Sequence, residues 1–401
     1  MNLNVKIVVI FTAVIFSSAG ILIAIDQTDV KPVSDSSPYQ DIIYANNQFG
    51  LDFYSQINGN NDNLFFSPWS ISTAFAILQE GARGNTAKQI GDAFGFSDDS
   101  SQRQSGFKSF NDRLNHPNSD YLLSVANAFW LSHDFAPKQN YVDVTKDYYD
   151  SHVEQVDFSA DGTDIINKWV SSKTHGKIKD LFEPGALDGA SFAITNAIYF
   201  KGTWNKQFDP DRTKMRDFWA SEDSAISVPM MYLPESKQRA ALTEEVHLLE
   251  LPYDGDKISM LVLLPAQRHG LSGLESALSI EKISQWKKDL QESSMAVMMP
   301  KFKLETDYDL IPLLKSLGVS DAFGADADFG GISDSNLFVG EAVHKAFVEI
   351  NEEGTEAAAA TGIGGFQSGP PTFEVDQPFM FVIQDNESGN ILFMGRVIDP
   401  T

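Results

Sequence analysis

The chain has 401 residues, of which 42% are hydrophobic and 21% are charged, the composition of a folded protein with a large core. Its formal net charge is −25 and it contains no run of Lys and Arg, so nucleic acids, heparin-like polyanions and anionic lipids are not expected as partners. Cysteine is absent, which excludes disulfides, thiolate metal sites and thiol nucleophiles.

An apolar run opens the chain. Residues 7–25 are nearly all apolar and follow Lys6, a pattern typical of a signal peptide or a short membrane anchor. The Ser-Ser-Ala sequence at 17–19 suits signal peptidase, but the apolar run then resumes, as in an uncleaved anchor. Both alternatives for residues 1–25 remain open, and both place the rest of the chain outside the cell, either secreted or tethered to the outer face of the membrane. Residues 26–38 are typical of a polar linker.

The next part of the chain is predicted to be mostly helical. Apolar residues recur at helical spacing over 39–57, and Ser67 and Pro68 are suited to the cap and first position of a helix that continues over 69–80. Further helices are expected over 86–94, 105–114 and 165–172. Residues 122–131 are apolar with two adjacent aromatics, which predicts a buried strand.

The second half is predicted to be rich in strands. Residues 192–200 form a nearly continuous apolar run, as expected of a central buried strand. Residues 248–253 and 258–264 flank an Asp-Gly pair, which predicts a hairpin. Further strands are expected over 295–301, 342–350, 379–384 and 391–397. Helices followed by many strands indicate an α+β fold with large sheets, in one domain over 39–401.

No catalytic or metal-binding motif is recognisable. The sequence has no nucleophile elbow, zinc-protease motif, Walker loop or dinucleotide-binding glycine pattern. Asp326 and Asp328 begin like a calcium loop, but Leu337 stands where a bidentate Glu is required. We therefore expect neither an enzyme nor a protein that holds a metal or a cofactor.

The most informative segment covers residues 350–379. After a predicted strand it contains two glutamates, a Gly-Thr-Glu sequence, four alanines, a glycine-rich stretch and a proline pair before the next strand. A flexible surface loop is the simplest interpretation. However, the loop is long, joins two strands and carries an alanine-rich stretch that is unusual in turns.

At this point the chain resembles the serpins, serine protease inhibitors, in a microbial-type form. Segments that resemble the family lie at 63–90, 166–182, 195–204, 337–360 and 376–400. The resemblance implies the serpin fold, in which helices pack on three β-sheets and a reactive-centre loop is exposed. It implies an irreversible suicide-substrate inhibitor of serine endopeptidases, whose cleaved loop inserts into the main sheet while the protease is covalently attached. The alternative is a non-inhibitory serpin that acts as a binding or chaperone-like module.

The resemblance also assigns the loop hinge. Its residues are Glu352, Glu353, Gly354, Thr355, Glu356, Ala357, Ala358, Ala359, Ala360 and Thr361. In a strand, Thr355 and every second residue as far as Thr361 share one face, and their small side chains can be buried, whereas Glu356 lies on the other face. About ten new backbone hydrogen bonds at about 1 kcal/mol each would make insertion downhill, so the uncleaved fold is expected to be metastable.

Two further groups are assigned by the resemblance. Ser67, Ser70, Asn196 and His344 match the family's shutter cluster, where the main sheet must open, and Trp204 matches the breach, near the entry point of the loop. Without the resemblance, His344 would be interpreted as a core histidine with satisfied hydrogen bonds, and the two interpretations are compatible.

Different counts place the scissile bond at different positions. Counting forward from Gly354 gives the bond between Ser368 and Gly369, whereas counting back from the proline pair gives the bond between Gln367 and Ser368. Phe366, the aromatic residue near the loop centre, offers a third bond, with Gln367. We favour the bond between Gln367 and Ser368.

The loop composition predicts the class of target. No Lys or Arg occurs from Glu356 to Thr372, so chymotrypsin-like, elastase-like or subtilisin-like proteases are expected rather than trypsin-like ones. The target protease, bound as a covalent acyl complex, is the expected partner, and the inhibitor itself is expected to be a monomer.

Overall fold

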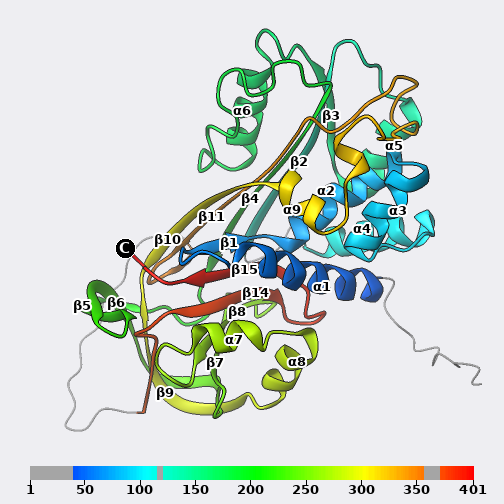
Figure 1. Ribbon diagram of the computed structural model, residues 1–401. Helices are drawn as coiled ribbons and strands as arrows, with labels where there is room; N and C mark the ends of the chain where they lie inside the picture. Colours follow the sequence, from blue (N-terminus) through cyan, green and yellow to red (C-terminus); the bar gives the residue numbers. More distant parts are fainter. Residues whose placement is uncertain (1–38, 115–120, 356–370) are drawn as a thin grey trace, which may run out of the picture. The chain divides into compact units, whose positions relative to one another are not determined.

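The computed structural model describes residues 39–114, 121–355 and 371–401 (Figure 1). The expected targeting segment and linker, residues 1–25 and 26–38, lie outside the described residues. Within the described ranges, no helix combines the length and the apolar character needed to cross a membrane.

The helices of the described residues surround two hydrogen-bonded sheets. The helices are α1 (Gln40–Ile57), α2 (Pro68–Gly81), α3 (Gly84–Phe94), α4 (Ser100–Leu114), α5 (Gln139–Tyr149), α6 (Gly162–Lys173), α7 (Leu271–Ser276), α8 (Ile280–Lys288) and α9 (Leu310–Ser316). The strands are β1 (Leu64–Phe66), β2 (Tyr121–Ser132), β3 (His152–Val156), β4 (Phe192–Thr203), β5 (Asp209–Ser221), β6 (Ser224–Leu242), β7 (Val246–Pro252), β8 (Ile258–Pro265), β9 (Gln291–Pro300), β10 (Phe302–Asp309), β11 (Glu341–Ile350), β12 (Gly354–Thr355), β13 (Thr372–Glu374), β14 (Phe379–Asp385) and β15 (Ile391–Val397).

The elements predicted from the sequence are confirmed, with ends that shift by a few residues. The start of α2 follows the prediction closely, because Ser67 Oγ accepts the Ser70 N–H at 3.1 Å and Pro68 occupies the first helical position. The sequence analysis did not identify the longer elements α5, β5, β6 and β10, nor the shorter elements β1, β3, β12, β13, α7, α8 and α9. Several of these elements have a weak local signal: β10 alternates buried with exposed positions, and in α5 only Tyr141, Thr145 and Tyr149 are buried.

The six-stranded sheet has the order β10-β11-β12-β4-β2-β3. At its centre β4 and β11 run parallel and pair directly, from Ala193 opposite Glu341 to Tyr199 opposite Phe347. Figure 1 shows these strands side by side, with α6 on one face and α2 on the other. Alternation along β2 explains this arrangement, since Ala126, Ala128 and Trp130 pack with α6 while Leu123 and Phe129 join the core on the side of α2.

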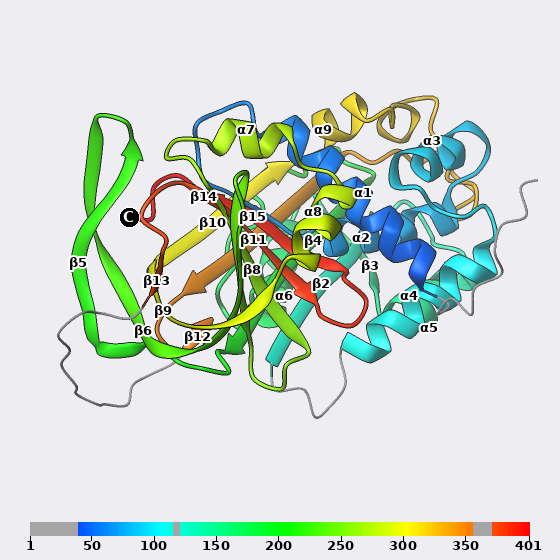
Figure 2. The same ribbon diagram turned by 90° about the horizontal axis from the view of Figure 1, so that it is seen from below.

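The nine-stranded sheet joins two of the three sheets that the resemblance implied. Both β6 and β9 run through it, and their pairing shifts in register between Leu233 and Ser236. The strand β5 pairs with the earlier part of β6 and β7 with its later part, so a local bend separates two layers that remain hydrogen-bonded. Figure 2 shows β5 and β6 as a long ribbon at one edge.

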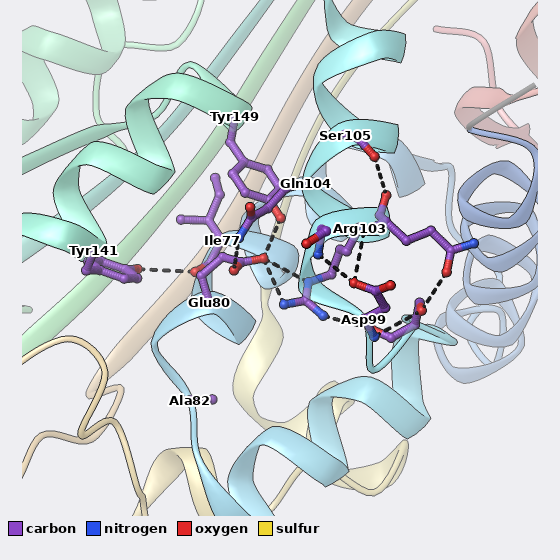
Figure 3. A network of polar contacts seen from close by, with 12 residues as sticks. Ile77, Glu80, Ala82, Asp99, Arg103, Gln104, Ser105, Tyr141 and Tyr149 are labelled. Atoms are coloured by element: carbon purple, nitrogen blue, oxygen red, sulfur yellow. Dashed lines mark hydrogen bonds and ion pairs between the residues drawn. The ribbon is translucent and has the colours of Figure 1, made fainter.

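A buried ion pair ties three helices together beneath the six-stranded sheet (Figure 3). The Arg103 guanidinium of α4 lies 2.8 Å from Glu80 Oε1 of α2, and their side chains are only 5% and 7% exposed. Tyr149 of α5 donates its hydroxyl to the same oxygen at 2.7 Å, and Gln104 donates to Glu80 Oε2 at 2.7 Å. Both oxygens of the nearly buried Glu80 carboxylate therefore accept hydrogen bonds from protein groups.

We predict that Arg103→Met lowers the free energy of unfolding by about 3 kcal/mol, because it leaves the buried Glu80 carboxylate without its cation. The midpoint of the first urea-induced transition measures the loss. Adding Glu80→Gln to this variant removes the unpaired charge and restores much of the stability. Lys88→Met is the control, since the Lys88–Asp92 pair is exposed and its loss should have no measurable effect. An Arg103→Met protein as stable as the wild type would contradict the prediction.

Candidate functional site

The hinge begins inside the six-stranded sheet. Gly354 and Thr355 form β12, which pairs with β4 on one side through Thr203 and Gly202 and with β11 on the other side through Ile350. The two central strands are thus in direct contact over most of their length and separate at one end, where the hinge lies between them. The first residues of the loop already have the geometry of an added strand.

Only glycine fits at position 354. Its φ is +148°, and an added Cβ would collide with the Gly202 carbonyl oxygen and come within 2.7 Å of Thr203 Cα. Because the obstacles are backbone atoms of β4, no side-chain movement can relieve the collision. The sequence pointed to backbone rotation as the role of Gly354, and the structure adds a steric requirement.

Thr355 is buried between the ends of β4 and β11, next to two stacked aromatic rings. Its side chain is 1% exposed, and its Oγ1 lies 3.2 Å from the hydroxyl of Tyr253. The ring of Tyr253 stacks on Trp204 at 4.4 Å, and burial raises the pKa of the tyrosine, so its hydroxyl stays protonated. Trp204 donates its indole N–H to the Asn351 carbonyl at 3.0 Å. The resemblance had indicated Trp204 but not Tyr253, whose contact with Thr355 spans 102 residues.

Glu352 holds the hinge from the side. One carboxylate oxygen lies 2.8 Å from the ammonium of Lys301, and the other accepts the hydroxyl of Thr213 at 2.6 Å. Burial by itself raises the pKa of this carboxyl, but the hydrogen bonds from Lys301 and Thr213 outweigh it and the pKa is lowered. Neighbouring Glu353 is also buried, and its Oε1 has no protein partner among the described residues.

The structure brings the four residues of the expected shutter into one hydrogen-bonded cluster. His344 Nε2 accepts the backbone N–H of Ser67 at 3.1 Å, so Nδ1 carries the proton and donates it to Asn196 Oδ1. This bond joins β11 to β4 across the line where the two strands meet. Burial lowers the pKa of His344 to about 3, which keeps the ring neutral at physiological pH.

The cluster extends to Asn127, a residue that the sequence analysis missed. Asn196 Nδ2 donates to the Ser70 carbonyl at 2.8 Å, to Ser70 Oγ at 2.7 Å and to Asn127 Oδ1. Asn127, Asn196 and His344 lie opposite one another on β2, β4 and β11, so a polar row crosses the sheet. A lone amide in the middle of the apolar run 122–131 was the available signal.

A segment that follows α6 covers the line between β4 and β11. Lys345 of β11 donates to the carbonyl of Asp180 at 3.2 Å, and the ammonium of Lys177 lies 5.3 Å from the centre of the Phe347 ring. Asn167 of α6 anchors this segment by accepting the backbone N–H groups of Leu181 and Phe182, each at 3.0 Å. A strand that enters between β4 and β11 must displace part of this cover.

The remaining predicted loop residues lie outside the described residues. They are Glu356, Ala357, Ala358, Ala359, Ala360 and Thr361 of the hinge, and Phe366, Gln367, Ser368 and Gly369 around the scissile bond. Among the described residues, no group of three or more His, Asp or Glu is arranged to hold a metal ion.

We predict that stability falls as the pH drops below the ordinary pKa of histidine. Between about 6.5 and 3 the unfolded chain binds a proton at His344 and the folded chain does not, so acid favours unfolding in this window. At pH 5 the loss relative to pH 7 is about 2 kcal/mol from this residue, measured by urea denaturation. His344→Gln should abolish that part of the pH dependence, and His133→Gln, at an exposed site, should retain it. Equal pH slopes for the wild type and His344→Gln would contradict the assignment.

Comparisons with known proteins agree with this geometry. The family model described as "Serpin (serine protease inhibitor)" matches residues 44–400. An uncharacterized serpin-like protein of Methanosarcina acetivorans is 39% identical, over 92% of this chain and 90% of its own. The leukocyte elastase inhibitor of Sus scrofa is also 39% identical, over 89% of this chain and 98% of its own.

A solved structure with the same fold belongs to a ligand-binding protein. Human thyroxine-binding globulin, crystallised with thyroxine, superposes with a TM-score of 0.83 at 29% identity, over 91% of this chain and all of its own. Serpins are mostly protease inhibitors rather than enzymes, and this relative shows that the fold also serves in ligand binding. The family match over residues 44–400 and the identity to these relatives lead to one conclusion: the chain belongs to the serpin family.

Proposed function

We propose that the chain is an irreversible suicide-substrate inhibitor of serine endopeptidases. The observation that carries this proposal is the position of β12 between β4 and β11. The chain continues from Thr355 through Glu356 into four alanines and Thr361, so further strand pairing can extend from a start that is already formed. The non-inhibitory alternative gains no comparable support from Thr355, a small residue at the hinge position that is buried between β4 and β11.

Insertion of the loop replaces the pairing of β4 with β11 by two pairings, one on each side of the new strand. A protease cleaves the loop and forms an acyl-enzyme, and the segment upstream of the cleaved bond then advances between β4 and β11. These strands must separate by one further strand spacing, about 4.8 Å, which breaks the hydrogen bond between Asn196 and His344. The new strand pairs on both sides, so about ten backbone hydrogen bonds are gained overall, each contributing about 1 kcal/mol. The attached protease is carried along and distorted before water can release it.

The entry point selects small side chains. Thr355 is buried against Tyr253, and the Glu352–Lys301 pair holds the adjoining backbone in place. A bulky or charged residue at 355 has no room and no partner there. In this proposal Trp204 and Tyr253 form the breach, and Ser67, Ser70, Asn196 and His344 form the shutter.

The target and location follow from segments outside the described residues. The loop has no basic residue, which favours chymotrypsin-like, elastase-like or subtilisin-like targets, and a similar protein is named as an inhibitor of leukocyte elastase. The apolar run over 7–25 supports a protein that is secreted or tethered to the outer face of the membrane.

We predict that the wild type forms complexes with chymotrypsin or subtilisin that survive boiling in detergent. Thr355→Arg should be cleaved without forming a complex, because the charged side chain cannot enter the sheet. Glu356→Arg is the matched control: it places the same residue on the opposite face and should still inhibit. The mass of the released peptide distinguishes cleavage after Phe366, Gln367 or Ser368. Undiminished inhibition by Thr355→Arg would refute the mechanism.

Cleavage of the loop should also make the wild type harder to melt. The inserted strand adds hydrogen bonds and buried surface, so the midpoint of thermal unfolding should rise by more than roughly 10 °C, measured by circular dichroism before and after nicking. Nicked Thr355→Arg should melt no higher than its intact form. If the nicked wild type melts at the temperature of the intact protein, insertion does not occur.

A further inference from the structure

The strand β5 runs between the two points where the proposed reactive loop joins the body. Near its start, Thr213 donates its hydroxyl at 2.6 Å to Glu352, just before the hinge. Near its end, the backbone N–H of Trp219 donates at 2.7 Å to the carbonyl of Asp376, just after β13, the first strand beyond the loop. Figure 2 shows β5, β12 and β13 at the same end of the molecule. The stretch 214–218 therefore lies between the two ends of the loop.

This stretch of β5 is an exposed edge. Among the described residues β5 pairs with β6 and with no other strand. Phe218 is fully buried and fixes the strand against the core, whereas Lys214, Arg216 and Asp217 are exposed and Met215 is 62% exposed. An apolar side chain between two exposed cations can thus be reached by a partner.

The cations of this edge have no carboxylate partner. No ion pair to Lys214 or Arg216 is present in the part of the chain that the structure describes. In contrast Lys237 and Arg239, on the adjacent strand β6, are each paired with a glutamate. Lys214 and Arg216 share one face of β5 with Arg212, which stacks at 3.7 Å over an aromatic ring of β6. On a chain with a net charge of −25, this row is a local reversal of charge.

The position of the row makes it accessible to a protease that holds the loop. Such a protease buries about 800 Å² of its partner, a patch about 30 Å across, whereas residues 214–218 span about 17 Å of extended strand. We propose that Lys214, Met215 and Arg216 form a second contact surface for the target protease, which carries acidic residues beside its substrate cleft. This surface rests on the proposed function, because it acts only when a protease attacks the loop.

The row of cations orients the incoming protease. The net negative charge of the inhibitor repels an acidic surface almost everywhere, and β5 offers that surface a favourable contact next to the loop. Charges at the rim of an interface act mainly on the rate of association, and salt screens them. Charged side chains on an edge strand also hinder pairing between molecules, a role that is compatible with the contact.

The encounter is tested with succinylated anhydrochymotrypsin, which has an acidic surface and cannot form an acyl-enzyme. Lys214→Gln combined with Arg216→Gln should slow association about tenfold at about 20 mM salt and less than about twofold at 0.5 M, measured by surface plasmon resonance. Lys88→Gln combined with Lys108→Gln is the matched control. It removes the same charge from exposed sites on α3 and α4, which lie at the other end of the molecule from β5 (Figures 1 and 2), and should associate like the wild type.

The apolar part of the surface is tested separately. Met215→Ser should weaken the affinity for the same probe about fivefold at both salt concentrations, because salt does not screen the burial of an apolar side chain. Wild-type binding by this variant and by the Lys214→Gln, Arg216→Gln protein would overturn the inference. An equal loss in the matched control would also overturn it, because net charge alone would then explain the effect.

Active succinylated chymotrypsin separates this inference from the proposed function. If the variants slow the encounter but the active enzyme cleaves the loop without forming a complex that survives boiling in detergent, the proposed function fails alone. If such complexes form at the same rate with the wild type, Met215→Ser and the Lys214→Gln, Arg216→Gln protein at low salt, the inference fails alone.

Discussion

The direct pairing of β4 with β11 is the constraint on which the rest of the structure depends. These strands lie at the centre of their sheet, and the middle of their contact is polar: Asn196 and His344 form a buried hydrogen bond across it. A buried polar pair is satisfied only in register, so it aligns the strands more strictly than apolar side chains would. His344 can serve here because burial keeps it neutral, with one nitrogen as donor and the other as acceptor.

The hinge lies at one end of this contact. There Gly354 and Thr355 pair with β4 and β11 along the same strand edges that elsewhere pair with each other. Gly354 is placed where any Cβ would strike the backbone of β4, and Thr355 fills the space in front of Tyr253. The ion pair between Glu352 and Lys301 lies beside this point, partly exposed, so it restrains the hinge without burying an unpaired charge. Steric fit on the inside and electrostatics on the outside together hold the start of the loop at the gap between the strands.

The two faces of the six-stranded sheet are covered in different ways. On one face α6 and the segment after it lie across β11, held by a small buried apolar cluster and by polar contacts such as the Lys345 ammonium on the Asp180 carbonyl. On the other face the buried pair of Glu80 and Arg103 ties α2, α4 and α5 into one body (Figure 3). In the proposed insertion, the strands that move must slide over these helices and displace the cover. The polar row of His344, Asn196 and Asn127 runs from the contact between β4 and β11 to β2, where β2 lies close to α2, α4 and α5.

The sequence by itself determined the elements whose signals are local: the cap at Ser67 and Pro68, the apolar runs of β2 and β4, and the small residues after Gly354. Its resemblance to the serpins also identified the family, and it singled out Ser67, Ser70, Asn196 and His344, which the structure joins in one hydrogen-bonded cluster. Only the tertiary structure decided that β12 sits between β4 and β11, that Tyr253 faces Thr355, and that Asn127 joins the shutter. It also decided the half-exposed strands β5 and β10, which have no continuous apolar run. The physical reason is that these features are contacts between residues far apart in the chain, and local spacing does not encode which distant strand supplies the partner.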